Sequence, residues 1–116
     1  MKIKTLKLQW DSLDYFVAKA QWSYIYTDDA SCMQIGRREH YSTSWEAAGR
    51  IIESEGIELH HNPDLAGRNI AWLAVYPRQD KGTNGPTPLV AAMRCYVRAK
   101  FGDEADIPPE FVDLIV

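Results

Sequence analysis

The stretch from Thr87 to Gly102 constrains the fold most, because it carries signals for the start, the buried face and the end of one long helix. Thr87 is a good N-cap, and Pro88 is suited to the first helical position. Gly102 stands where glycines commonly end helices. Apolar side chains recur at helical spacing between these signals, at Leu89, Ala92, Met93, Tyr96 and Val97. A helix with one apolar face needs other elements to cover it, and the remaining chain is expected to supply them.

The first third of the chain is predicted to form a helix, a strand and an irregular segment. Residues 12–21 are predicted to be helical, because Leu13, Phe16, Val17 and Ala20 form one apolar stripe. The β-prone residues Trp22–Thr27 follow and are expected to form a strand. Residues 28–41 are polar and are expected to be irregular, with a turn at Asp28-Asp29 and a break at Gly36.

The middle of the chain predicts a second helix and a strand. Thr43-Ser44-Trp45-Glu46 fits a capping box, in which Thr43 accepts the backbone N–H of Glu46 while Glu46 reaches back. The helix is expected to run to about Glu55 and to stop at Gly56. Apolar and polar residues then alternate in Ile57–His61, which is typical of a half-buried strand.

The segment Ile70–Tyr76 is nearly all apolar and is predicted to be a central strand, which could pair with Ile57–His61 as a hairpin. Residues 62–69 and 77–88 are expected to be loops. After Pro108-Pro109, the apolar residues of the C-terminal tail are expected to dock as one helical turn: Phe111, Leu114 and Ile115.

These elements predict a single α+β domain over residues 1–116, with a small antiparallel sheet and helices packed mainly on one face. The chain has no internal repeat and no linker long enough to divide it. A chain of this length buries enough surface to form a core without disulfides or metals.

The composition argues against several classes of partner. The formal net charge is −3 and most of the 13 Lys and Arg are scattered, whereas a nucleic-acid binder usually carries a basic stripe. No segment approaches the roughly 20 apolar residues of a membrane span, and no signal peptide is recognisable. We therefore expect a cytoplasmic protein with reduced thiols that binds neither nucleic acid nor membranes.

No catalytic or metal-binding constellation is recognisable in the sequence. His60 and His61 are adjacent and would point to opposite faces of a strand, and His40 lies apart from them. Cys32 and Cys95 lack metal or redox spacing and an evident partner base. No glycine-rich phosphate loop is present. We therefore expect a protein without enzymatic activity, bound metal or cofactor.

Two predicted helix starts are the candidate binding residues, because the free N–H groups and the dipole of a helix start attract anions. The first carries Gly85 and Thr87, with Arg94 two turns along the helix. The second lies in the segment Tyr41, Ser42, Thr43, Ser44 and Trp45, which sets hydroxyls between two aromatic rings. Both starts are consistent with simple helix caps, and also with a pocket that binds phosphate or sugar through hydroxyls and an aromatic ring. The same choice applies to Arg94, which would either bind a phosphate or bridge to the acidic segment 103–113.

Two blocks of the sequence resemble NinX-like proteins. Tyr41-Ser42-Thr43-Ser44-Trp45, then Ile51-Ile52-Glu53 and Glu55-Gly56-Ile57, resembles the family's YSPSTDW…PIIEREGI region. Residues 85–97, GPTPLVAAMRCYV, with Lys100-Phe101-Gly102-Asp103-Glu104, are similar to its GPTPLIAAMRCYVASKLGDEV. The pairs Leu13-Asp14 and Val17-Ala18-Lys19-Ala20 match its N-terminal helix.

The resemblance covers most of the chain but departs from the family in three places. Ala48-Gly49-Arg50 stands where the family often has Gly-Gly-Pro, Trp22 stands where it often has Gly, and residues 23–40 align poorly. The family is encoded by tailed phages and prophages, so the resemblance implies a phage setting inside a bacterial host. Small phage accessory proteins commonly counter host defence, some of them by holding signalling nucleotides without cleaving them.

The leading hypothesis is therefore a non-enzymatic, anti-defence protein that sequesters a nucleotide-type ligand, such as an ADP-ribose derivative or a cyclic dinucleotide. Tyr41 and Trp45 would stack on the base, and the hydroxyls and helix N–H groups would bind phosphate or ribose. A homo-oligomer would let a domain of this size build the pocket at an interface. The alternative is an interaction protein that masks a host or phage protein. A nucleic-acid binder and an enzyme such as a phosphodiesterase are weaker readings, because no lysine cluster and no catalytic constellation support them.

Overall fold

The protein was analysed as a computed structural model, which describes residues 2–79 and 82–111. Within these residues the helices are α1 (Trp10–Trp22), α2 (Asp29–Glu39), α3 (Trp45–Glu55) and α4 (Pro88–Phe101). The strands β2 (Glu58–His61), β3 (Trp72–Val75) and β4 (Gly82–Gly85) form an antiparallel sheet in the order β2-β3-β4. A second antiparallel pair joins the two ends of the chain, β1 (Lys2–Lys4) and β5 (Glu104–Asp106). Short 3-10 turns complete the order: η1 (Thr5–Lys7), η2 (Pro63–Leu65) and η3 (Pro109–Phe111).

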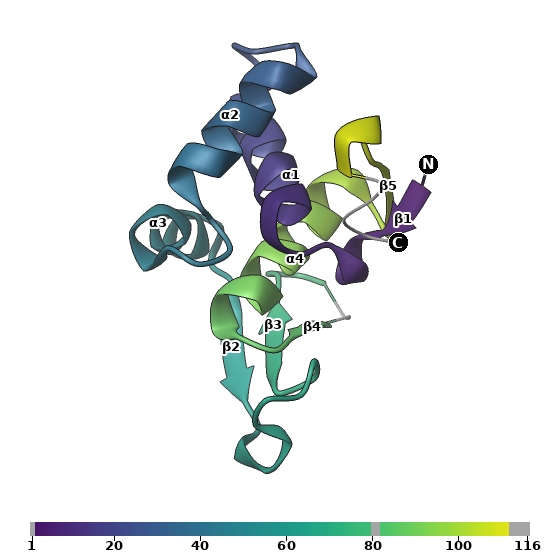
Figure 1. The fold of residues 1–116 in the computed structure, drawn as a ribbon. Helices are drawn as coiled ribbons and strands as arrows, with labels where there is room; N and C mark the ends of the chain where they lie inside the picture. Colours follow the sequence, from purple (N-terminus) through teal and green to yellow (C-terminus); the bar gives the residue numbers. More distant parts are fainter. Residues whose placement is uncertain (1, 80–81, 112–116) are drawn as a thin grey trace.

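Helix α4 is the centre of the molecule. Every residue from Leu89 to Val97 is buried, and α4 packs against all three strands of the larger sheet and against α1 and α3. Figure 1 shows β2, β3 and β4 on one side of α4 and the other three helices on the opposite side. The structure confirms the predicted α+β fold, and Thr87 caps α4 as expected by accepting the N–H of Val90 at 3.2 Å.

The predicted hairpin is present, with β3 as the central strand. His61 pairs with Trp72 in β2-β3, and Trp72 pairs with Gly85 in β3-β4. Strand β4 was not predicted, because its sequence Gly-Thr-Asn-Gly carries no β-prone pattern. Its pairing with β3 and its contact with α4 hold it in place. A Cβ at Gly85 would lie 2.6 Å from the backbone nitrogen of Ala91, so glycine lets this strand approach α4 closely.

The prediction for residues 22–41 was wrong. Trp22 is the last residue of α1, and a turn at residues 23–25 replaces the expected strand. The segment expected to be irregular is helix α2, whose N-cap Asp28 accepts the N–H of Ser31 at 2.9 Å. Gly36 does not break this helix. A Cβ there would lie 2.8 Å from the carbonyl carbon of Asp14, so the glycine lets α2 cross close to α1.

Two further expectations need adjustment. Ser44, not Thr43, is the N-cap of α3: its hydroxyl accepts the N–H of Ala47 at 3.3 Å, and the Thr43 hydroxyl donates to the carbonyl of His40 at 3.4 Å. In the tail, Phe111 is buried in η3 as expected, whereas Leu114 and Ile115 lie outside the described residues.

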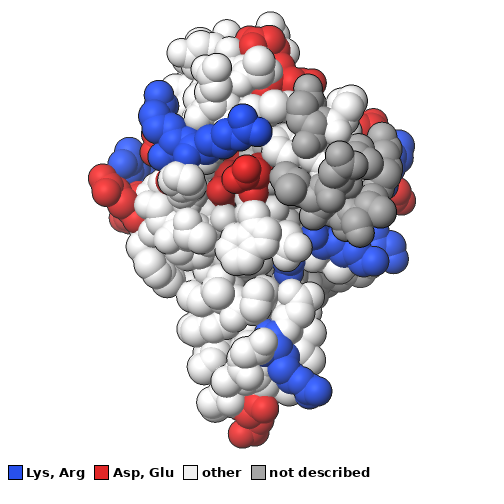
Figure 2. All heavy atoms as spheres, viewed as in Figure 1, with Lys and Arg blue, Asp and Glu red and all other residues white. Residues whose placement is uncertain are grey.

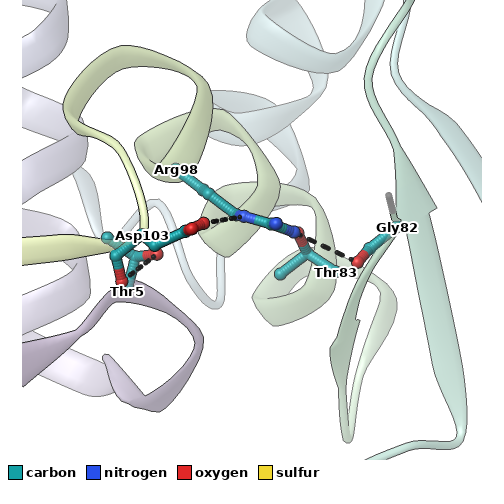
Figure 3. Close-up of polar contacts among 5 residues, drawn as sticks. All are labelled: Thr5, Gly82, Thr83, Arg98 and Asp103. Carbon is teal, nitrogen blue, oxygen red and sulfur yellow. Dashed lines mark hydrogen bonds and ion pairs between the residues drawn. The ribbon is translucent and has the colours of Figure 1, made fainter. Parts of the chain in front are cut away.

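The expected bridge between the last helix and the acidic segment is made by Arg98, not by Arg94. Figure 3 shows the Arg98 side chain between Asp103, whose carboxylate accepts from Nε at 2.7 Å, and the β4 residues Gly82 and Thr83. The carbonyl of Asp103 accepts the backbone N–H of Thr5 at 2.8 Å. These contacts fasten both ends of the chain to the sheet and leave Arg94 for another role.

Candidate functional site

A pocket of about 280 Å³ lies where the starts of α1, α3 and α4 meet. Its lining comes from three separate parts of the sequence and is predominantly apolar. The lining residues are Gln9, Trp10, Ser42, Thr43, Trp45, Pro86, Thr87, Pro88, Leu89, Val90 and Arg94. The two helix starts singled out in the sequence therefore share one concave site.

Five of the predicted binding residues line this pocket: Ser42, Thr43, Trp45, Thr87 and Arg94. Tyr41 does not. Its ring is buried in the core, and its hydroxyl accepts the indole N–H of Trp22 at 3.3 Å, so Tyr41 is not placed to stack on a ligand. Gly85 does not line the pocket either, because it lies in β4 against α4.

Trp10 is the main pocket residue that the sequence did not indicate. Its side chain is 61% exposed and that of Trp45 is 58% exposed, so two large apolar rings stand at the open end of the pocket. Exposure of two indoles beside one cavity is a signal for binding. The sequence could not show this feature, because Trp10 and Trp45 line one pocket only through the packing of α1 and α3 on α4.

Arg94 forms part of the closed end of the pocket. The residue is 3% exposed, and its guanidinium donates to the carbonyl of Leu8 at 2.7 Å, to Oδ1 of Asn69 at 3.0 Å and to the carbonyl of Asn84 at 3.1 Å. These bonds use Nε and Nη1. In residues 2–79 and 82–111, no carboxylate forms an ion pair with Arg94 and no hydrogen bond uses Nη2. Burial lowers the pKa of this guanidinium from its ordinary value. A buried cation without a counter-ion is suited to an anionic ligand.

Ser42 brings a buried hydroxyl to the lining of the same pocket. The residue is 2% exposed, and among the described residues its hydroxyl meets hydrogen-bond geometry with no group. Its backbone N–H donates to Oδ1 of Asp14 at 2.7 Å. Burial raises the pKa of that carboxyl, and the hydrogen bond from the Ser42 N–H offsets only part of this effect. Asp14 thus fixes the turn that presents Ser42 to the pocket.

We expect Asp14→Asn to make the protein more stable at neutral pH. The amide oxygen still accepts the Ser42 N–H, but the cost of burying a charge is removed. Because the pKa of Asp14 in the folded protein lies above its ordinary 3.8, the wild type should lose stability relative to the variant as pH rises through that range. Urea unfolding of both proteins between pH 3 and 8 measures the difference in the free energy of unfolding. The values at about pH 3 serve as the reference, because the Asp14 carboxyl is then mostly protonated and uncharged. A difference that does not change with pH would contradict this role of Asp14.

The start of α4 adds a free donor to the pocket. The first-turn N–H groups of a helix have no partner within the helix. At this start Pro88 has no N–H and Thr87 accepts that of Val90, so in the described structure the N–H of Leu89 is left. Leu89, Arg94 and Ser42 all line the pocket, so this N–H, Nη2 of Arg94 and the Ser42 hydroxyl are candidate donors to a ligand there.

The residue types that line the pocket limit the chemistry that its side chains can supply. No lining residue is His, Cys, Asp, Glu or Lys, so the pocket holds neither a general base nor a thiol nucleophile. The described residues contain no group of three or more His, Cys, Asp or Glu placed to hold a metal ion. On the face drawn in Figure 2, Lys and Arg form separate groups with uncharged surface between them. No helix among the residues described is long and apolar enough to cross a membrane.

Comparison with known proteins identifies a family. The model of the family described as bacteriophage P22 NinX matches residues 5–100. The match includes both helix starts and every residue that lines the pocket. No curated protein and no solved structure matches the chain. Because the matched region covers most of the 116 residues, the chain belongs to the bacteriophage P22 NinX family of phage proteins.

Proposed function

We propose that this phage protein binds a small nucleotide-type ligand in the pocket and holds it without transforming it. The observation that carries the proposal is the lining of the pocket, which combines the buried Arg94 cation, paired with no carboxylate among the described residues, and the unpartnered Ser42 hydroxyl with two exposed indoles. A ligand with a negative group at one end and a planar ring at the other complements both ends of such a site.

The contacts available are enough for sequestration only if they act together. Stacking on an aromatic ring contributes about 1–3 kcal/mol per base. Sub-micromolar affinity needs more than about 8 kcal/mol. The remainder would come from the phosphate or carboxylate that accepts from Arg94, Ser42 and Leu89, since hydrogen bonds to charged groups contribute about 1.5–3 kcal/mol each. The pocket volume of about 280 Å³ lies at the lower end for small-molecule sites and favours one nucleoside unit per chain.

Sequestration of a host signalling nucleotide fits the phage setting that family membership supports. A protein that only sequesters its ligand needs high affinity and abundance but no catalytic groups. The pocket lining offers hydrogen-bond donors and two indole rings for such binding. The biological role that we propose is therefore anti-defence: the protein lowers the free concentration of a nucleotide immune signal in the infected cell.

Trp45→Ala is expected to fold normally and to lose most ligand retention, because its exposed ring makes little contribution to the core. Purified wild type and variant are incubated with extract of phage-infected cells, washed and denatured, and the released small molecules are identified by mass spectrometry. The wild type should release a phosphorylated metabolite with an aromatic ring. The variant should release it at about one tenth or less of that amount, as loss of stacking predicts. Equal release by both proteins would contradict the proposal.

One observation favours the interaction-protein alternative. The turn between α1 and α2 exposes Tyr24, Ile25 and Tyr26, which are 76%, 53% and 42% exposed, at the end of the molecule where Figure 1 shows the turn projecting. Apolar side chains at such a tip are typical of protein contacts. In the same extract experiment, a protein partner captured equally by wild type and Trp45→Ala would favour this alternative.

A further inference from the structure

We propose that Trp10 is held in a strained backbone conformation so that its indole and that of Trp45 clamp the planar ring of the ligand. This inference rests on the proposed function, and it specifies the ligand class: a flat aromatic ring, accessible on both faces, joined to an anionic group. The observations that carry it are the backbone of Trp10, the anchoring of the residues around it, and the pocket that both indoles line.

The backbone of Trp10 has a φ of 53°, in the left-handed region. Glycine and asparagine adopt this region readily, whereas a bulky side chain at such a position is an outlier. His40 also has a φ of 53°, but it ends helix α2, where a left-handed residue is ordinary. Trp10 stands at the start of α1, where no such need exists. Strain of this kind persists when surrounding contacts impose it, and it is concentrated at binding sites.

The contacts that impose it are present on both sides of Trp10. On one side Leu8 is fully buried, and its carbonyl accepts from Nε of Arg94 at 2.7 Å. On the other side the Ser12 hydroxyl donates to the carbonyl of Gln9 at 2.8 Å and accepts its N–H at 3.4 Å, which ties Gln9 to the first turn of α1. Arg94 therefore anchors the segment that presents Trp10 as well as facing the pocket itself.

The side chain that this conformation presents is not used by the core. Trp10 is 61% exposed, and in the described chain it forms no ring pair, although ring pairs such as His61 with Trp72 at 4.3 Å occur elsewhere. Trp45 likewise forms none. Both indoles line one cavity without stacking on each other, so a planar ring has two aromatic walls to contact.

The clamp is tested with two variants that remove the ring equally but differ in backbone, Trp10→Gly and Trp10→Ala. At an ordinary first-turn helical position alanine is the more stabilising of the two. At a position with left-handed backbone, glycine is the more stabilising residue, because the Cβ of alanine clashes with the backbone. We expect Trp10→Gly to melt at a higher temperature than Trp10→Ala, and the reverse order would overturn the strain argument.

Binding is measured by isothermal titration with adenosine 5′-monophosphate and with ribose 5-phosphate, which lacks the ring. The wild type should bind the first at least tenfold more tightly. Both Trp10 variants should reduce that ratio about tenfold and leave the affinity for ribose 5-phosphate unchanged. If the wild type binds both compounds equally, or if the variants keep the wild-type ratio, the anion site stands and the clamp is overturned. If the wild type binds neither compound, the proposed function fails and the clamp fails with it.

Discussion

Replacing Arg94 by methionine is expected to lower the free energy of unfolding by about 3 kcal/mol, because it leaves buried acceptors without their donor. Those acceptors are the carbonyls of Leu8 and Asn84 and the side-chain oxygen of Asn69, so the variant loosens the N-terminal segment, the β2–β3 loop and β4 together. For a domain of this size the loss corresponds to roughly 10 °C in melting temperature. Urea unfolding and thermal scans measure both quantities.

Arg98→Met is the matched control in the same helix. The Arg98 side chain is 18% exposed, but its partner Asp103 is 73% exposed and its bonds to β4 are long, at 3.4 and 3.5 Å. Ion pairs with an exposed partner contribute about 0–1 kcal/mol. The control should therefore lose much less stability than Arg94→Met. Equal losses in the two variants would contradict the central structural role of Arg94. Because Arg94 supports the fold, the binding of ligand is better tested at Trp45 and Trp10, whose rings are exposed.

Gly36→Ala is expected to destabilise the protein by about 2–3 kcal/mol, because overpacking without room to relax costs amounts of this order. The added Cβ would meet the carbonyl carbon of Asp14 at 2.8 Å and the backbone nitrogen of Tyr15 at 3.0 Å. These are backbone atoms of α1, so the strain cannot be relieved by a change of rotamer. Chemical denaturation gives the difference.

Gly49→Ala provides the control, since Gly49 lies inside α3 with no atom within 4 Å of an added Cβ. A helical glycine replaced by alanine where the Cβ meets no neighbour stabilises a protein by about 0.5–1 kcal/mol. The two identical substitutions should therefore have opposite signs. If Gly36→Ala were also stabilising, α2 would not cross α1 as closely as the structure describes.

The sequence indicated those parts of the fold whose determinants are local. Helix α4 carries its cap, its apolar stripe and its terminal glycine within a single segment, and it was predicted nearly residue for residue. Helix α2 was missed because the feature that places it, the close contact of Gly36 with α1, is tertiary, and Gly36 alone indicates a break. Strand β4 was missed for a similar reason: Gly85 fits a space next to α4, and Gly82 a space next to β3, that only the folded protein defines.

The same distinction applies to the site. The hydroxyls of Thr43 and Thr87, the cap at Thr87 and the charge of Arg94 were visible in the sequence. The sequence did not show which aromatic rings face the pocket, because the side chain of a turn residue can point into the core or away from it. Tyr41 points into the core and Trp10, distant in sequence, takes a place at the open end.

The central proposal is that one pocket, lined by the starts of α1, α3 and α4, binds an anion and a ring together. The most direct measurement is a nitrogen-15 NMR titration of the full chain with adenosine 5′-monophosphate. The account predicts that the indole N–H signals of Trp10 and Trp45 shift together with the backbone N–H signals of Ser42 and Leu89, and that all saturate at one ligand per chain. Shifts confined to the exposed turn at residues 24–26, or no saturable shift at all, would contradict it.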